Sequence, residues 1–310
     1  MKKIITLITV LTFSLCGYSQ QIPLHSLYMM DLSMINPAVA GSYDFTPISA
    51  NYRRQWAGFE GAPETQYVNA HRYFGKNVGL GLAFFNEVTA PTRRTGLQFS
   101  FAYHLPLSDD YSRKISFGLA PVFFQHYLNA EQVTTHEPND PAVVGGYNNQ
   151  LSPDANFGVM FSDEKYYAGL SVFNLLQISR NLFDVVDKID NPINRTFYLV
   201  GGYNYKINES ISLEPSALVQ YQEATPFQFD VNLKAEYNKL LGLGVSYRHQ
   251  DALVYMAFLS YDNFRIAYSY DMTLSDMNRY SLGSHEFHLS YRIPNAMKTE
   301  EKRESMPLFY

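Results

Sequence analysis

Large apolar residues alternate with small or polar residues along most of the chain after residue 46. The clearest run lies within 94–105, where five large apolar residues occupy every second position: Leu97, Phe99, Phe101, Tyr103 and Leu105. Because successive side chains of a β-strand point to opposite faces, this spacing places all five on one face. The same alternation returns within 226–237, 240–248 and 264–272. The pattern predicts a chain built almost entirely of strands with one apolar face.

The same criterion predicts fourteen strands. They are 47–56, 64–74, 77–87, 94–105, 114–125, 154–161, 165–175, 195–206, 210–222, 226–237, 240–248, 252–261, 264–272 and 283–293. The alternation is broken in 47–56 and in 195–206. Repeated runs of about ten residues with alternating polarity, separated by turns, are typical of outer-membrane barrels. The predicted fold is all-β, an antiparallel transmembrane β-barrel of outer-membrane type.

The connections between the predicted strands support this fold. Short turns fall at even-numbered connections: Gly75-Lys76, 162–164, 207–209, 238–239 and 262–263. Long connections fall at odd-numbered positions: 126–153, 176–194 and 273–281. Outer-membrane barrels have long outward loops and short periplasmic turns, so this alternation predicts two distinct ends. An even strand number also returns both chain ends to the periplasmic side.

The N-terminus has the features of a secretory signal peptide. Two lysines precede an apolar stretch that is too short to span a bilayer as a helix, and small residues precede Gln20. Removal of residues 1–19 would also remove Cys16, the single cysteine, so disulfides and thiolate metal sites are not expected. The expected organisation is a signal peptide at 1–19, a plug-like segment at 20–46, a barrel at 47–293 and a periplasmic tail at 294–310.

A soluble β-sandwich or barrel would show the same alternation with its apolar face turned inward. The export signal, the aromatic residues near strand ends and the absence of a linker all favour the membrane. A charge at mid-depth on the lipid face costs about 2–4 kcal/mol, so charged strand residues are expected to face the lumen. These residues are Asp230, Lys234, Glu236, Arg248, Arg265, Asp271, Glu286, His288 and Arg292.

Candidate chemistry in the chain is sparse. His285 and His288 flank Glu286, but positions i and i+3 of a strand face opposite sides, so no metal site is predicted there. Serine, histidine and carboxylate residues do not fall in a catalytic motif, and no cofactor is expected. The net charge of −5 and the absence of a basic patch argue against nucleic acid as a partner. The sequence predicts a protein that is not an enzyme.

Several short motifs resemble those of the PorP/SprF family in order and spacing, over about residues 25 to 293. They include Ile35-Asn36-Pro37-Ala38-Val39-Ala40-Gly41, Tyr52-Arg53-Arg54-Gln55-Trp56-Ala57-Gly58, Gly61-Ala62-Pro63-Glu64-Thr65 and Gly283-Ser284-His285-Glu286. Tyr28 precedes the first of them. The candidate site residues, structural or partner-binding, are Tyr28, Asn36, Pro37, Ala38, Gly41, Tyr52, Arg53, Gln55, Trp56, Gly58, Gly61, Ala62, Pro63, Thr65, Gly283, Ser284, His285 and Glu286.

The resemblance implies an outer-membrane protein of the type IX secretion and gliding-motility apparatus of Gram-negative Bacteroidetes. SprF-like members serve particular cell-surface adhesins, so the implied partners are a secreted adhesin's C-terminal domain and components of that machinery, besides outer-membrane lipid. A porin or nutrient channel is the alternative. We expect residues 20–46 to pack at or inside the periplasmic mouth, and Arg53 and Trp56 to brace the loop from Gly58 to Pro63 at the opposite rim.

Overall fold

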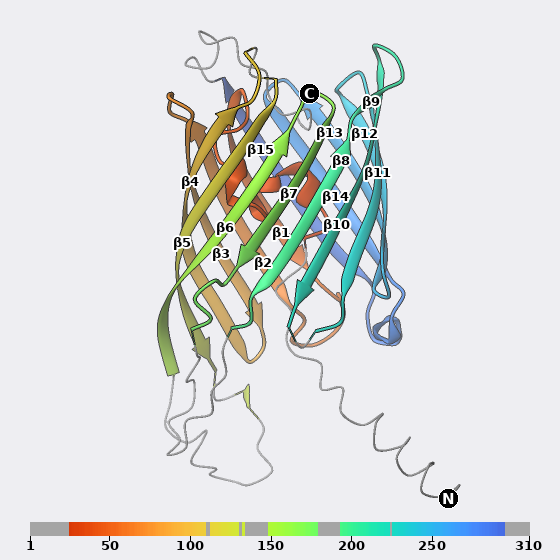
Figure 1. Cartoon of the computed structure of the whole chain (residues 1–310). Coiled ribbons are helices and arrows are strands. Elements are labelled where there is room, and N and C mark those ends of the chain that lie inside the picture. The colour runs from red at the N-terminus through yellow and green to blue at the C-terminus, as the bar shows by residue number, and fades with distance from the viewer. Residues whose placement is uncertain are drawn as a thin grey trace, which may run out of the picture.

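The protein folds as a closed antiparallel barrel with a short segment of chain inside it (Figure 1). The computed structural model describes residues 25–109, 112–129, 132–133, 148–178, 193–223 and 225–294. The expected signal peptide and nearly all of the expected tail lie outside these residues. Among the described residues, no helix has both the length and the apolar character that crossing a membrane requires.

Each strand pairs with the next along the chain, and the last pairs with the first. The strands are β1 (Phe45–Arg54), β2 (Glu64–Tyr73), β3 (Val78–Thr89), β4 (Thr92–Pro106), β5 (Lys114–Leu128), β6 (Asn148–Ser162), β7 (Tyr166–Phe173), β8 (Thr196–Tyr203), β9 (Tyr205–Lys206), β10 (Ile211–Gln222), β11 (Gln228–Tyr237), β12 (Leu241–Arg248), β13 (Ala252–Tyr261), β14 (Phe264–Thr273) and β15 (Ser284–Pro294). Both β8 and β9 pair with β10, so they are one strand interrupted at Asn204. The barrel therefore has fourteen strands, as predicted.

The two faces of the strands differ as the alternation predicts. In β11, Val231 and Leu233 are about half exposed on the outer face, whereas Asp230 and Lys234 are buried in the lumen. The charged residues that were expected to face the lumen do so, and all but Arg292 are buried. Exposed tyrosines lie near strand ends on the outer face: Tyr52, Tyr103, Tyr166, Tyr203, Tyr221, Tyr237, Tyr247 and Tyr261. This position matches the aromatic girdles of membrane barrels.

The lumen is partly apolar, which explains where the alternation fails. In β8 the inward residues Tyr198 and Val200 are as apolar as their outward neighbours Phe197 and Leu199. They belong to a core in which the internal segment packs against inward side chains of several strands, including Leu218 of β10. A strand that is covered by lipid on one face and by apolar protein on the other is apolar on both. The weak pattern in 195–206 therefore marks the wall that the internal segment covers.

The predicted connections need correction. β5 continues to Leu128 and β6 begins at Asn148, so the connection between them is 129–147 and not 126–153. The odd-numbered connections are also not uniformly long, because β3 and β4 are joined by Ala90-Pro91 and β12 and β13 by 249–251. The end that holds 55–63, 129–147, 174–195 and 274–283 is called the long-connection end, and the other end the short-turn end. A 3₁₀ turn, η5 (Asp276–Arg279), lies in the last of these connections.

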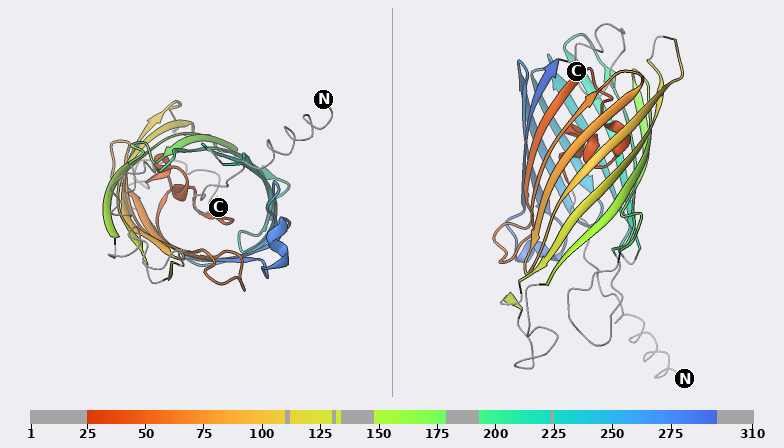
Figure 2. Two further views of the ribbon diagram at one scale, coloured as in Figure 1. Left: turned by 90° about the horizontal axis from the view of Figure 1, so that it is seen from below. Right: turned by 90° about the vertical axis from the view of Figure 1, so that its left-hand side faces the viewer.

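The internal segment, residues 25–44, is called the lumen segment (Figure 2). It contains three 3₁₀ turns, η1 (Tyr28–Met30), η2 (Leu32–Met34) and η3 (Pro37–Val39). The side chains of Asp31 and Asn36 accept hydrogen bonds from the backbone N–H groups two residues later and so begin η2 and η3. Short polar side chains and a proline favour such turns over a strand. Two of the three turns in the segment are therefore capped by its own side chains.

Candidate functional site

The lumen segment runs along the inside of the barrel from the long-connection end toward the short-turn end. The backbone N–H of Ser26 donates to Glu286, near the start of β15, at 2.6 Å. The ammonium group of Lys114, the first residue of β5, donates to the carbonyl of Ser42 at 3.1 Å. These two strands begin at opposite ends of the barrel. The segment thus extends well beyond the periplasmic mouth, which the sequence analysis did not anticipate.

Ser26 is held by a buried group of charged side chains near the long-connection end. Its hydroxyl donates to Asp271 at 2.7 Å and accepts from Arg53 at 2.9 Å and from Arg248 at 3.0 Å. Arg53 also pairs with Asp271 at 2.8 Å and with Glu286 at 3.0 Å. These five residues are called the Ser26 socket. It joins the lumen segment to β1, β12, β14 and β15.

The socket is electrically balanced, which allows its burial. Two guanidinium groups face the carboxylates of Asp271 and Glu286, and Arg248 pairs in addition with Asp230 of β11 at 3.1 Å. The Arg53 and Arg248 side chains are at most 2% exposed. A buried charge is tolerated only when it is paired and hydrogen-bonded, so each member of the socket depends on the others.

Nearer the short-turn end, wall glycines make room for the backbone of the lumen segment. A Cβ atom on Gly79 would lie 1.9 Å from the carbonyl oxygen of Ala40, and one on Gly118 would lie 2.2 Å from the backbone nitrogen of Ala38. A Cβ atom on Gly158 would lie 2.0 Å from the side-chain oxygen of Asn36. These three positions, on β3, β5 and β6, are called the glycine seat. Any side chain there would occupy the space that the segment fills.

Gly118→Ala is expected to dislodge η3 from the wall, because backbone atoms of the segment, and not a flexible side chain, stand within contact distance of the new carbon. Single-channel current in planar bilayers should rise, while the folded band on semi-native gels persists. The matched control is Gly201→Ala in β8, whose Cβ would lie at an ordinary contact distance of 3.4 Å from the carbonyl oxygen of Tyr167. Equal, low currents from both variants would show that the seat does not hold the segment.

Polar side chains of β2 and a backbone carbonyl of β6 also contact the segment. Asn69 donates to Asp31 at 2.8 Å and to Ser33 at 2.7 Å, and Asn36 donates to the carbonyl of Val159 at 3.1 Å. The backbone N–H of Gly41, which has a φ of +73°, donates to His71 at 3.0 Å. At this φ a residue with a side chain would be strained, and the site is also crowded by Gly79.

The family motifs at 52–58 and 61–65 meet the motif at 283–286 at the rim of the long-connection end. The backbone N–H of Ala57 donates to Gly283 at 2.7 Å, and that of Trp56 donates to the Ser284 hydroxyl at 3.1 Å. Gln55 donates to Pro63 across the base of the same loop at 2.9 Å. The loop therefore joins the first and last strands at their ends.

Arg53 does not brace this loop, contrary to expectation. The alternation of β1 turns its side chain inward, to the Ser26 socket, and turns Tyr52 outward. Of the other rim residues, Thr65 is buried on the inner face, and Gly58 and Gly61 have positive φ values within the loop, as Gly283 does in the facing connection. Ala62 donates its N–H to the carbonyl of Phe59 at 3.2 Å.

The structure places Tyr28 inside the lumen and His285 on the outer face of the barrel. Tyr28 accepts a hydrogen bond from Asn232 of β11 at 2.6 Å. His285 faces outward and shares a hydrogen bond with Tyr268 at 2.7 Å, whereas His288 is buried inside. In the part of the chain that the structure describes, no three histidine, cysteine, aspartate or glutamate residues are grouped to hold a metal ion.

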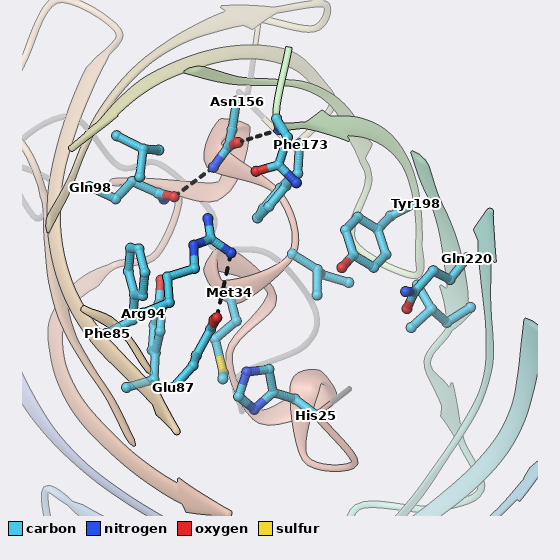
Figure 3. A pocket seen from close by; sticks show the side chains of 15 residues that line it. His25, Met34, Phe85, Glu87, Arg94, Gln98, Asn156, Phe173, Tyr198 and Gln220 are labelled. Carbon is cyan, nitrogen blue, oxygen red and sulfur yellow. Dashed lines mark hydrogen bonds and ion pairs between the residues drawn. The ribbon is translucent and has the colours of Figure 1, made fainter. Parts of the chain in front are cut away.

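A small cavity remains between the lumen segment and the wall toward the long-connection end (Figure 3). Arg94 projects into it, pairs with Glu87 at 3.5 Å and lies over the rings of Phe85 and Phe124 at 5.0 and 4.4 Å. On the far side Tyr198 lines the cavity. The cavity is a part of the lumen that the lumen segment leaves unfilled.

Sequence reasoning did not identify Ser26, Asn69 or His71 as contacts of the segment, nor the glycine seat. Asn69 and His71 have one visible signal, which is that they are polar residues at inward positions of β2. That signal distinguishes lumen from lipid but does not show what occupies the lumen.

The chain is similar over most of its length to several solved structures of low sequence identity. The CymD monoaromatic hydrocarbon channel is 12% identical, with a TM-score of 0.48, over 90% of this chain and 95% of that one. A FadL homologue of Pseudomonas aeruginosa is 10% identical, with a TM-score of 0.48, over 88% and 95%. The toluene transporter TbuX of Ralstonia pickettii is 9% identical, with a TM-score of 0.48, over 90% and 96%. No curated protein matches the sequence.

A family model agrees with the sequence motifs. The model described as type IX secretion system membrane protein PorP/SprF matches residues 17–291, which includes the whole lumen segment and all strands but the end of β15. Together with the barrel and its apolar outer face, this match locates the protein in the outer membrane of Gram-negative Bacteroidetes. The chain belongs to the PorP/SprF family of type IX secretion system membrane proteins.

Proposed function

We propose that this protein is a non-enzymatic outer-membrane component that helps secrete or anchor a cell-surface adhesin. The C-terminal signal domain of the adhesin would bind at the long-connection end, and the barrel would hold it at the surface and link it to the secretion and motility machinery. Family membership supports the link to type IX secretion. The observation that favours binding over transport is the filled lumen.

The lumen is filled by a built-in part of the chain. Leu27, Tyr28, Leu32 and Val39 of the lumen segment have 0% exposed surface, so protein packs closely around this part of the segment. Polar wall residues that a water-filled pore would expose, such as Asn51, are also buried. A diffusion porin requires a continuous aqueous path. This barrel has instead a closed interior, with the Ser26 socket toward one end and the glycine seat toward the other.

The long-connection end offers a surface for a large partner. Connections at this end follow β1, β5, β7 and β14, and in outer-membrane barrels the end with the longer loops faces the cell exterior. Binding residues commonly lie on loops that a rigid scaffold positions. A closed barrel is such a scaffold, so the partner is expected to contact these connections and not the strands.

Deletion of the gene is expected to remove one adhesin from the cell surface while other secreted proteins still reach the medium, because the barrel serves a particular cargo. Surface proteomics of the mutant and its complemented strain checks this. If every adhesin stayed in place and uptake of a small solute was lost instead, the porin alternative would replace this proposal.

Shortening the connection 129–147 is expected to reproduce the loss of the adhesin while leaving a folded barrel, because loops tolerate deletion better than strands. The matched control shortens the connection between β4 and β5, at the short-turn end, and should leave the adhesin in place. Surface labelling of the adhesin and semi-native gels of the barrel measure the two effects. Equal adhesin levels in both variants would exclude 129–147 as the binding surface.

A further inference from the structure

An apolar groove lies on the outer face of the barrel across β10 to β14. Its volume is about 620 Å³, and nearly all of its lining is apolar. Most of the lining residues point outward from their strands: Ile211, Ala235, Tyr237, Leu241, Leu243, Ala257, Leu259, Ile266 and Tyr268. The strands meet in tight turns at 238–240 and at 262–263, directly beside these residues. The groove is therefore close to the short-turn end.

Small residues at outward positions create the groove. Leu243 of β12 is in register with Ala235 of β11 on one side and with Ala257 of β13 on the other. Leu243 is 68% exposed, so it projects between two hollows. On the inner face the sizes are reversed, since the ring of Phe258 covers Gly242, where a Cβ atom would lie 1.9 Å from it. At this part of the wall the large side chain of Phe258 lies on the inner face, and the small side chains of Ala235 and Ala257 lie on the outer face.

We propose that this groove binds an acyl chain of a phospholipid in the periplasmic leaflet of the outer membrane. A hollow on the lipid face of a barrel is filled by neither water nor protein, and unfilled space forfeits dispersion contacts. A flexible hydrocarbon chain can restore them. The short-turn end of an outer-membrane barrel is periplasmic, which selects a phospholipid over lipid A of the outer leaflet.

The turns at the rim of the groove suit a zwitterionic headgroup. Lys239 stands in the turn between β11 and β12, and Lys206 precedes the turn that leads to Ile211. Glu209 and Asp262 lie in turns at the same end, and all four residues are exposed. Basic residues attract the phosphate and acidic residues attract an ammonium group. Phosphatidylethanolamine presents both charges above a pair of acyl chains.

Native mass spectrometry of the full-length protein tests this inference. The protein, purified in mild detergent, is incubated with palmitoyl-oleoyl phosphatidylethanolamine or with lipid A, and bound lipid is counted at rising collision energy. The test variant is the double change Ala235→Leu and Ala257→Leu, which fills both hollows. The matched control is Ala50→Leu, an alanine on the outer face of β1 and outside the groove. Ala257→Leu alone is a second test variant if the double variant folds poorly.

The expected result is one phosphatidylethanolamine that stays bound to the parent and to Ala50→Leu after other lipids are stripped, and that is lost from the groove variants. Equal retention by all four proteins would overturn the inference, and so would the absence of any retained lipid. Preferential retention of lipid A, or of a co-purified acylated protein in place of phospholipid, would also overturn it. None of these outcomes bears on the adhesin, because the groove and the long connections lie at opposite ends.

Discussion

A protein that lacks residues 25–44 is expected to form a large, steady pore in planar bilayers, whereas the full chain conducts poorly. The lumen segment supplies the apolar side chains that cover Tyr198, Val200 and Leu218 on the wall. Without it, buried polar residues such as Asn51 and Asn69 would be hydrated, and the space the segment occupied would fill with water. Strand pairing does not involve the segment, so the barrel itself should persist.

Two measurements test this expectation. Single-channel current is compared between the full chain, the deletion variant and the Gly118→Ala variant, with Gly201→Ala as the unperturbed reference. Heat-modifiable migration on semi-native gels shows that each barrel is folded. The current is expected to be highest for the deletion variant, lower for Gly118→Ala, and lowest for the full chain and Gly201→Ala. A folded deletion variant with the low current of the parent would show that something other than the lumen segment closes the barrel.

Arg53→Met is expected to lower the stability of the barrel more than any other single change at a charged residue of β1. It leaves the carboxylates of Asp271 and Glu286 buried with a lost partner, and breaking a buried ion pair in this way costs about 3–5 kcal/mol. The temperature at which the folded band disappears from semi-native gels should fall clearly. The segment should also loosen, because Ser26 loses one of its hydrogen-bond donors.

The neighbouring residue provides the control. Arg54 points outward on the same strand, is 50% exposed and pairs with Glu64 at 3.6 Å. An exposed pair of this kind contributes about 0–1 kcal/mol, so Arg54→Met should leave the transition temperature nearly unchanged. Adding Glu286→Gln to Arg53→Met should recover part of the loss, because Asp271 keeps its pair with Arg248 whereas Glu286 has lost its guanidinium partner. If Arg53→Met and Arg54→Met behaved alike, the Ser26 socket would not contribute to stability.

The face of each strand residue could be predicted from sequence because the side-chain period of a strand is fixed at two. Asp230 inside and Val231 outside follow from this rule alone, and both are confirmed. The rule is weak where both faces are apolar, as at Tyr198 and Leu199. It also misplaced the start of β6, which was predicted at residue 154, because the strand continues toward its N-terminal end through the inward polar residue Ser152.

The path of the lumen segment could not be predicted, because it depends on contacts between residues distant in sequence. Nothing near Ser26 indicates that it lies beside Glu286, and nothing near Asn36 indicates that Gly158 leaves space for it. The motif around Arg53 was recognised from its resemblance to a family, yet its role was assigned to the nearby loop. Only the pairing of β1 with β15 brings Arg53 to Glu286, and local sequence does not encode that closure.

The hydrogen bond between Ser26 and Glu286 joins residues 260 positions apart, one ahead of the first strand and one in the last. During synthesis and export the N-terminal residue is available first, but its acceptor arrives only with the final strand. A chain truncated before β15 would have neither a closed ring nor the carboxylate that retains Ser26. Sealing of the interior is thereby coupled to completion of the polypeptide.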